Sequence, residues 1–592
     1  MVVLGAKLTH HDTGAAIIAD GRVCAIAEER LDRVKHSNTF PRRSIAYCLQ
    51  ALGLAPADVD LVVVDQVDLP SAVRMAEIFR RETGGAFSRA ELAVINHHDA
   101  HAASAFLCSP FDDAAILVYD GAGERFRTHL GVTATETETL YRGTGRTIAP
   151  IQKTMHLRDG KSFPYTFGIG KLYALLSEHY IGFGPYNEGK MMGLAPYGRD
   201  EFLKRFPLER WFCEVGGHIL ANARITFPGR RSAEGLRAGA YRLWRVAERS
   251  LGRLLARRLF SPAGGVFIEP ELFAEVRLPK PARSSEVALP DEYYASVART
   301  GQRVLEAVAV RWGQRLRAVT ASPNLCVAGG VGLNIDANRL FLGAVGFERI
   351  FIQPGSSDTG IGLSCALWGW HVVAGNPRAW VMRSSALGRP YTKEEIEQAV
   401  AARASDVEVT RPNDIAQAAA ELIADGKIVG WFQGGSEYGP RALGQRSILC
   451  DPRRPDMKDT LNLRVKHREP WRPFAASVLA ERMAEYFMLR QESPFMLLAA
   501  PVHPERRAEV PAVTHVDGTC RIQTVSAQEN GRFRELIAAF AAITGVPLLL
   551  NTSFNLAGEP MVETPAEAMA CFLATEMDYL ILEDRLITKR RA

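Results

Sequence analysis

The sequence lacks closely spaced cysteines. Its nine cysteines stand singly along the chain, and no two of them form a CxxC pair. This spacing excludes zinc ribbons and a dense disulfide framework. We therefore expect small, reduced core residues, as in a cytoplasmic protein.

Long apolar segments are also absent. No stretch of about 18 apolar residues, the length that spans a bilayer, runs without a charge or a break. Residues 1–7 enter an apolar strand directly, without the charged and apolar regions of a signal peptide. The chain is therefore expected to have no membrane partner.

The chain carries little excess charge of either sign. Its formal net charge of +5 is small for 592 residues, which argues mildly for anionic small ligands and gives little support for a nucleic-acid partner. The length suggests roughly two to four domains. The 47% hydrophobic content is that of an ordinary globular protein.

Apolar runs alternate with turn and helix signals, a pattern typical of an α/β protein. The first three runs form a hairpin-rich group, with Asp20-Gly21 as the turn between the second and the third. The run 114–119 opens a similar group, and 128–133 is expected to pair with it. We interpret the two groups as matching halves of a duplicated domain with a ligand cleft between them. The expected elements of the first half are strands 2–6, 15–19, 23–27, 61–64 and 93–95 and a helix over 42–52.

Two histidines and two aspartates suggest a metal site. His97 and His101 are four residues apart, so on a helix they project from one face. Asp120 closes the buried strand 114–119 and precedes a glycine loop, and Asp358 follows strand 350–352 in the same way. Spacing alone also fits ordinary surface or core histidines.

Two glycine-rich stretches suggest ligand loops. Strand 325–328 runs into Gly329-Gly330 and on to Asn334, which offers backbone N–H groups and a helix N-terminus to a phosphate or nucleotide. Residues 187–198 are expected to form an irregular loop, either a shaped binding loop or a plain connection. The arginine-rich region 229–290 is interpreted either as a variable insertion or as a contributor to the acceptor pocket.

Periodicity is lost between about residues 372 and 391, and a second α/β region follows. It contains expected helices over 393–402 and 414–424 and strands over 428–432 and 547–550. The polar run 433–447 and the later basic residues alternate with glycine and hydroxyl residues, a composition typical of a phosphate pocket. The basic residues concerned are Arg441, Lys466, Arg468, Arg472 and Arg521.

Taken together, these stretches resemble the NodU/CmcH family of O-carbamoyltransferases. The resemblance covers nearly the whole chain and rests on many blocks in one order. The main blocks are His11-Asp12, Glu28-Glu29-Arg30, Lys35-His36, His97 to His101, Asp120-Gly121, 187–198, 329–334, Asp358, 437–447, 466–474 and 551–555.

The resemblance implies two fused domains. Residues 1–375, with the insertion at about 229–290, would form a duplicated ribonuclease-H-like domain of the actin-like ASKHA type. Residues 376–592 would form a YrdC-like α/β domain. The C-terminal domain would make carbamoyladenylate from carbamoyl phosphate and ATP, accompanied by Mg(II), and the N-terminal domain would transfer the carbamoyl group to a hydroxyl and release AMP.

The resemblance also implies the residues of both sites. His97, His101, Asp120 and Asp358 would hold a divalent metal such as iron(II), with His98 as the alternative to His97. His11 would act as the base, with His10 as the alternative. In the N-terminal domain Lys35, Gly329, Gly330 and Asn334 would contact the nucleotide. The carbamoyl phosphate and ATP pocket would consist of Arg441, Lys466, Arg472, Arg521, Asn551 and Ser553.

The implied partner is a small-molecule hydroxyl acceptor, an antibiotic or other polyhydroxylated natural product, rather than a nucleic acid. A homodimer is compatible with the sequence. The alternative function is a threonylcarbamoyl-type tRNA-modification enzyme, although the mild charge offers little surface for tRNA. A hydrogenase-maturation carbamoyltransferase should carry cysteine pairs that this chain lacks. A non-catalytic ATP-binding regulator on an actin-like fold is the third possibility.

Overall fold

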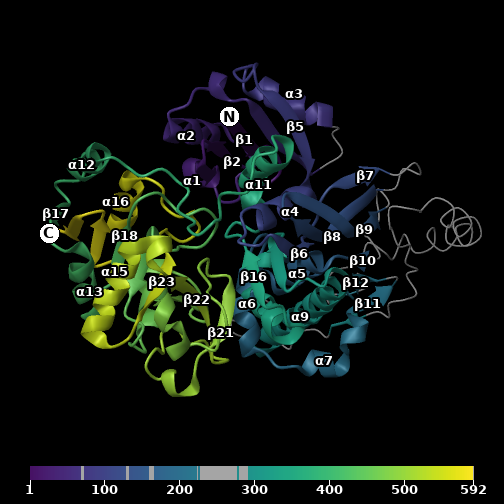
Figure 1. The fold of residues 1–592 in the computed structure, drawn as a ribbon. Coiled ribbons are helices and arrows are strands. Elements are labelled where there is room, and N and C mark those ends of the chain that lie inside the picture. Colours follow the sequence, from purple (N-terminus) through teal and green to yellow (C-terminus); the bar gives the residue numbers. More distant parts are fainter. Residues whose placement is uncertain are drawn as a thin grey trace, which may run out of the picture.

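A computed structural model describes residues 1–67, 72–127, 133–158, 166–215, 217–222, 225–226, 276–278 and 291–590 (Figure 1). The predicted insertion at 229–290 falls outside the described residues, apart from 276–278. Most of the strand predicted at 128–133 also lies outside them.

The first five strands form one sheet in the order β3-β2-β1-β4-β5. β1 lies at the centre, antiparallel to β2 and parallel to β4. Every residue of β1 and β2 is buried, which explains their uninterrupted apolar sequence. The strands are β1 Val2–Lys7, β2 Gly14–Ala19, β3 Arg22–Ala27, β4 Leu61–Gln66 and β5 Glu91–Asn96.

A second sheet repeats this arrangement, which confirms the predicted duplication. Its first strand β6 is central, antiparallel to β8 on one side and parallel to β15 on the other, and β16 follows in parallel. The partner expected at 128–133 is instead the long strand β8, which pairs with both β6 and β9. The strands are β6 Asp113–Tyr119, β7 Arg125–Arg127, β8 Thr133–Thr144, β9 Thr147–Arg158, β15 Asn324–Ala328 and β16 Arg349–Ile352.

Two helices lie between these sheets. α4 (His97–Leu107) packs on β6 and β15, α11 (Ile361–Trp368) packs on β1 and β2, and the two helices contact each other (Figure 1). α11 approaches the strands closely because Gly5 and Gly362 have no side chain. A Cβ on Gly5 would come within 2.2 Å of the Ala366 backbone nitrogen.

A nine-stranded mixed sheet forms the C-terminal region, in the order β17-β25-β24-β18-β19-β23-β20-β22-β21. It occupies the green-to-yellow left part of Figure 1 and has a separate hydrophobic core. This agrees with the predicted second α/β region. Its strands are β17 Val407–Thr410, β18 Val429–Phe432, β19 Arg446–Cys450, β20 Ala475–Leu479, β21 Leu498–Pro501, β22 Thr519–Val525, β23 Leu548–Ser553, β24 Tyr579–Leu582 and β25 Arg585–Lys589.

The remaining elements surround these sheets. The small strands are β10 Thr166–Phe167, β11 Phe212–Val215, β12 His218–Asn222, β13 Ile225–Thr226 and β14 Val276–Arg277. The N-terminal helices are α1 Glu29–Asp32, α2 Arg42–Leu52, α3 Ala72–Glu82, α5 Ile169–Leu175, α6 Glu188–Leu194, α7 Glu201–Arg205, α9 Glu292–Thr320 and α10 Ile335–Leu340. The C-terminal helices are α12 Lys393–Ala401, α13 Ile415–Ala424, α14 Met457–Leu461, α15 Ala527–Thr544 and α16 Pro565–Leu573.

The expectation of an irregular loop at 187–198 was wrong. Residues 188–194 form α6, and a short 3-10 helix follows at Ala195–Tyr197. Met191 and Leu194 are fully buried, so tertiary packing stabilises a helix that the glycine content disfavours. Gly193 permits a close approach to Pro473, whose Cδ would lie 3.2 Å from an added Cβ.

The segment 374–392 contains no helix or strand other than the isolated bridge Ala386–Glu437, as the loss of periodicity predicts. Within it, the Arg378 guanidinium donates hydrogen bonds to the backbone carbonyls of residues 106, 107, 109, 111 and 145. This part of the segment is therefore tied to the end of α4, to the loop before β6 and to the turn between β8 and β9. The domain boundary at 375–376 stays a prediction.

All nine cysteines are free, and eight are buried, as expected. Over the described ranges no helix is long and apolar enough to cross a membrane.

Candidate functional site

The carboxyl ends of the parallel strands in both sheets meet at one place. Lys7 ends β1, Asp65 lies near the end of β4, and His97 directly follows β5. From the second sheet, Asp120 directly follows β6 and Asp358 comes six residues after the end of β16. Ligands of α/β sheets bind at such strand ends, so this is the expected place for a site.

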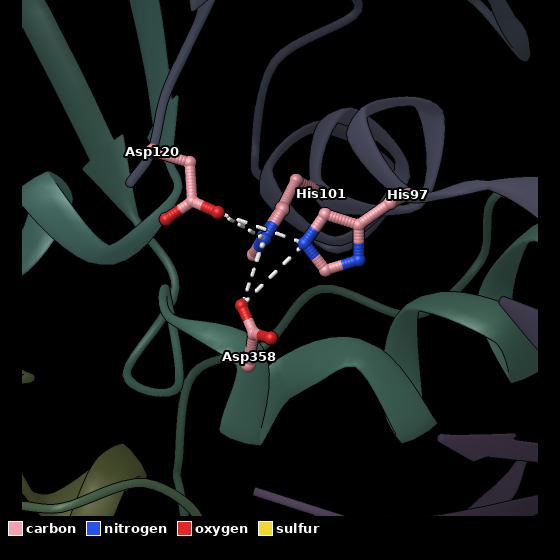
Figure 2. A group of neighbouring side chains, drawn as sticks. All are labelled: His97, His101, Asp120 and Asp358. Carbon is pink, nitrogen blue, oxygen red and sulfur yellow. Dashed lines mark ion pairs between the residues drawn. The ribbon is translucent and has the colours of Figure 1, made fainter. Parts of the chain in front are cut away.

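His97, His101, Asp120 and Asp358 form a compact, buried cluster (Figure 2). The His97 Nε2 atom lies 3.6 Å from Asp120 Oδ2 and 3.5 Å from Asp358 Oδ1. His101 Nε2 lies 3.5 Å from Asp358 Oδ1 and 4.0 Å from Asp120 Oδ2. One potential ligand atom from each residue lies within 4.8 Å of the others. The four residues predicted from the sequence are thus brought together.

The cluster fits a divalent metal. The His97 Nδ1 atom lies 3.0 Å from Asp65 Oδ2, and this contact turns Nε2 toward the cluster. A carboxylate outside the ligand set commonly orients a metal-binding histidine in this way. His97 Nε2 and both ring nitrogens of His101 are buried without a hydrogen-bond partner, an uncommon state for buried polar atoms. Two imidazoles and two carboxylates suit a transition metal such as iron(II).

His98 lies outside this cluster. Its Nδ1 atom is 2.8 Å from the Thr139 hydroxyl, and burial lowers the pKa of His98 to about 4. Of the two histidines considered from the sequence, the structure therefore directs His97 toward the aspartates.

The buried charges of the cluster compensate one another. Burial alone would lower the pKa of His97, but the carboxylates of Asp358 and Asp120 outweigh it and raise this pKa well above its usual range. Although burial opposes the shift, Lys7 and His97 lower the pKa of Asp358 well below its usual range. The Lys7 Nζ atom lies 3.2 Å from Asp358 Oδ2 and is buried. Asp120 Oδ1 accepts a hydrogen bond from the Gly330 backbone N–H at 2.8 Å.

We expect metal binding to weaken as the pH falls. Because the raised pKa favours protonated His97 in the metal-free protein, a metal must displace this proton. Affinity for Mn(II) should rise by about tenfold per pH unit for one displaced proton between about pH 6 and pH 8. Calorimetric titration in two buffers of different ionisation enthalpy measures the proton release. Asp113→Asn, which changes a carboxylate at the start of β6, is the control, and pH-independent affinity would contradict the expectation.

His11 lies beside the cluster. Its Nδ1 atom is 2.9 Å from Asp12 Oδ2, and its Nε2 atom is 3.9 Å from Asp358 Oδ2. Burial opposes protonation, but the hydrogen bond to Asp12 and the charge of Asp358 raise the pKa of His11. A carboxylate that accepts from Nδ1–H leaves the Nε2 lone pair free to accept a proton.

Asp12 also contacts a second imidazole. Its Oδ1 atom lies 2.8 Å from His36 Nδ1, and Glu29 Oε2 accepts from the His36 backbone N–H at 2.9 Å. The His36 ring stacks on Tyr186 with a centroid distance of 4.4 Å. Asp12, Glu29 and His36 also bring potential metal ligands within 4.8 Å. Because both Asp12 oxygens already contact imidazoles, we interpret this group as a hydrogen-bond network.

The glycine stretch after β15 supports the cluster. Gly329 has a φ of 92°, and an added Cβ would come within 2.3 Å of the Tyr119 carbonyl oxygen. The Asn334 side chain accepts from the Ala337 backbone N–H and exchanges hydrogen bonds with Gln302. It therefore caps α10 rather than pointing free into a cleft. Nucleotide contacts by Gly329, Gly330 and Asn334 stay predictions.

Basic side chains gather in the C-terminal region. Burial, and then the charge of Arg472, lowers the pKa of Arg441 to about 10 and that of Arg468 to about 9. Burial and the charges of Arg441 and Arg468 lower the pKa of Arg521 well below its usual range. Burial, and then the charge of Arg468, lowers the pKa of Lys466 well below its usual range. We call Arg441, Lys466, Arg468, Arg472 and Arg521 the basic cluster.

The basic cluster has little compensating negative charge. In the described part of the chain, its one ion pair joins Arg472 to Glu469 at 3.9 Å. The Nε atoms of Arg441 and Arg521 are buried without a partner. Lys466 is buried and the four arginines are partly buried. Cations that repel one another with few carboxylates beside them suit an anionic ligand.

The predicted polar residues line the same region. The Lys466 Nζ atom donates to Asn555 Oδ1 at 2.7 Å and to Ser553 Oγ at 3.4 Å. Asn551 is fully buried, and its amide donates to the Ala442 carbonyl and the Ser477 hydroxyl. Asn551 therefore holds the loop after Arg441 in place.

The two sites adjoin. Loss of hydration at Lys35, which precedes His36, lowers the pKa of its side chain; the charges of Arg472 and Lys190 add to this shift, and that of Glu29 opposes it. Tyr438, three residues before Arg441, donates from its hydroxyl to the Thr359 carbonyl at 2.6 Å. Thr359 directly follows Asp358, so the loop of the basic cluster contacts the loop of the metal cluster.

The sequence-based prediction did not include several residues that the structure places in these sites. Lys7 and Asp65 were not selected, although each directly follows an expected apolar strand as Asp120 does. Asp12 was noted beside His11 without a role. Arg468 was noted among basic residues but was not assigned to the pocket.

Comparison with known proteins agrees with this architecture. The family model described as "Carbamoyltransferase N-terminus" matches residues 2–86, 83–206 and 268–367, and "Carbamoyltransferase C-terminus" matches residues 420–589. An uncharacterized protein of Synechocystis sp. is 35% identical over 99% of this chain and 96% of its own length. Nodulation protein NolNO of Sinorhizobium fredii is 34% identical over 98% of this chain and 79% of its own. Nodulation protein U of Bradyrhizobium diazoefficiens is 26% identical over 96% of this chain and 94% of its own. The chain therefore belongs to the NodU-like carbamoyltransferase family.

Proposed function

We propose that this carbamoyltransferase is an ATP-dependent O-carbamoyltransferase with two linked sites. The basic cluster makes carbamoyladenylate from carbamoyl phosphate and ATP, and the site at His11 transfers the carbamoyl group to a hydroxyl. The observation that carries the proposal is the basic cluster of five residues, whose loop contacts the loop of the buried cluster of two histidines and two aspartates.

The basic cluster suits adenylate formation. Water first cleaves carbamoyl phosphate to carbamate and phosphate. A carbamate oxygen then attacks the α-phosphorus of ATP, with Mg(II) on the triphosphate, and pyrophosphate leaves as the new O–P bond forms. Carbamoyl phosphate, carbamate and ATP are all anionic, so Arg441, Lys466 and Arg521 would neutralise charge as these groups approach one another.

The His11 site suits transfer. The acceptor oxygen attacks the carbonyl carbon of the adenylate, the bond from this carbon to the phosphate oxygen breaks, and AMP leaves. His11 Nε2 would accept the hydroxyl proton while Asp12 holds Nδ1. A divalent ion such as iron(II), held by His97, His101, Asp120 and Asp358, would supply positive charge that anchors and polarises the adenylate.

The proposed acceptor is a small polyhydroxylated natural product, and the proposed location is the cytoplasm. The assay incubates the protein with ATP, carbamoyl phosphate and single acceptors from the aminoglycoside, cephem, aminocoumarin and ansamycin classes. A mass gain of one carbamoyl group on an acceptor, together with AMP, supports the proposal. A tRNA gel shift tests the alternative tRNA-modifying function. That alternative predicts a complex between the protein and tRNA, whereas the proposal predicts no complex.

His11→Asn should stop transfer but leave adenylate formation intact. Asparagine cannot accept the hydroxyl proton, and general-base catalysis contributes about 100- to 10,000-fold. Carbamoyl phosphate-dependent pyrophosphate release should stay at the parent rate, because His11 lies outside the basic cluster. His503→Asn, a change at a partly exposed histidine paired with Glu505, is the control. Normal transfer by the His11 variant would remove His11 from the mechanism.

A further inference from the structure

The carboxylate of Glu563 is fully buried and joins the C-terminal region to helices α1 and α2 of the N-terminal region. Its Oε1 atom accepts hydrogen bonds from the Tyr47 hydroxyl at 2.8 Å and the Tyr391 hydroxyl at 3.3 Å. Its Oε2 atom accepts from Arg30 at 3.3 Å. Tyr47 and Arg30 belong to α2 and α1, whereas Glu563 directly precedes the N-cap residue of α16.

The contact continues along α1. Arg30 also donates to the carbonyls of Glu437 and Val562, at 3.3 and 3.0 Å. Arg33 donates to the carbonyls of Met561 and Pro560, at 2.6 and 2.7 Å. The short helix α1 is therefore fixed to two C-terminal loops through directed hydrogen bonds rather than apolar packing alone.

From α1 the network reaches the transfer site. Glu29, the residue before Arg30, binds the His36 backbone N–H. His36 contacts Asp12, and Asp12 contacts His11. A displacement of α1 would therefore move the groups that hold His11.

In the other direction, Glu563 contacts the loop of the basic cluster. Its backbone carbonyl accepts from the Nε and one terminal nitrogen of Arg446, both at 3.3 Å. Arg446 is fully buried and lies 3.5 Å from the centroid of the Phe432 ring. Glu437 Oε1 accepts from the backbone N–H groups of Leu443 and Arg446, which closes the loop that contains Arg441.

We propose that Glu563 is a positioning residue that fixes the transfer site against the basic cluster, so that carbamoyladenylate stays with the protein between its formation and its transfer. This inference rests on the proposed function. A buried ion pair is weak evidence of added stability, and its better-attested role is to specify one arrangement. Glu563 forms hydrogen bonds with Arg30 of α1, Tyr47 of α2 and Arg446 of β19, and together these bonds define one such arrangement.

The test follows the adenylate in Glu563→Gln, which keeps the side-chain size but removes the charge that Arg30 requires. The protein is mixed with less than one equivalent of labelled ATP and with carbamoyl phosphate, without acceptor. Rapid filtration then separates bound from free carbamoyladenylate. We expect pyrophosphate release within about twofold of the parent, and a retained fraction of adenylate lower by about tenfold or more. Glu576→Gln, which changes an exposed glutamate of the C-terminal region that is paired with Arg464, should match the parent.

The double variant Arg30→Gln with Glu563→Gln separates positioning from stability. It removes both buried charges, so its melting temperature should recover toward the parent value, while retention of the adenylate should stay low. Recovery of retention together with stability would overturn the positioning role. If Glu563→Gln does not fold, Tyr47→Phe removes one hydrogen bond without a charge change. It should lower retention by a few fold, and unchanged retention would count against the proposal.

These outcomes are distinct from a failure of the proposed function. If the parent releases no pyrophosphate from ATP and carbamoyl phosphate, the proposed function is wrong. If the parent forms and retains the adenylate and Glu563→Gln retains it equally well, only the role of Glu563 is wrong.

Discussion

Arg441→Ala is expected to abolish carbamoyl phosphate-dependent pyrophosphate release. Arg441 lies on the loop of the basic cluster that contacts the loop of the metal cluster through Tyr438. Its Nε atom is buried and has no hydrogen-bond partner in the protein. Its guanidinium would be free to bind phosphate or carbamate with two N–H groups. Loss of one such preorganised donor costs about 100- to 1,000-fold in rate. A coupled pyrophosphate assay with saturating ATP measures the loss.

The control for this variant is Arg482→Ala, which removes a partly exposed arginine paired with Glu485 in the C-terminal region. It should release pyrophosphate at the parent rate, because exposed pairs contribute little. Transfer by Arg441→Ala should also cease, but it should return when preformed carbamoyladenylate is supplied. Parent-level pyrophosphate release by Arg441→Ala would exclude the basic cluster as the adenylating site.

Asp120→Asn is expected to give the opposite pattern, with adenylate formation kept and transfer lost. The substitution retains an oxygen that can accept from the Gly330 N–H but replaces the Oδ2 atom that faces His97 and His101. Loss of a carboxylate ligand should lower metal affinity by more than about 100-fold, since even outer residues contribute 10- to 100-fold. Elemental analysis of the purified variant and an acceptor assay measure the two effects.

Removal of metal from the parent with a chelator should reproduce the behaviour of Asp120→Asn, and added iron(II) should restore transfer in the parent alone. Asp113→Asn changes a carboxylate at the start of the same strand and should keep both metal and transfer. A metal content of Asp120→Asn equal to that of the parent would contradict the assignment of this cluster. Full transfer by the metal-free parent would contradict the role of the metal.

Much of the fold follows from local patterns. The hairpin of β2 and β3 is specified by two apolar runs around Asp20-Gly21, and the structure places the turn there. The duplication follows from β6 ending in a polar loop as β1 does. The pairing of His97 with His101 depends only on helical spacing, and α4 begins at His97. These features were predictable because neighbouring residues determine them.

Other features depend on contacts between distant parts of the chain. The helix at Glu188–Leu194 is stabilised by packing beside Trp471 and Pro473, which no local signal reveals. Lys7 reads as a surface residue at a strand end, yet the carboxylate of Asp358 lets it be buried. Arg30 and Glu563 are 533 residues apart, and only the folded chain joins them.

The most direct test of the central claim uses carbon-labelled carbamoyl phosphate with ATP and the metal-loaded parent protein. The account predicts that the labelled carbon appears in carbamoyladenylate, with one pyrophosphate for each adenylate, and that added acceptor moves the label to the acceptor as AMP forms. Intact ATP, with the label found only in carbamate and its breakdown products, would contradict it.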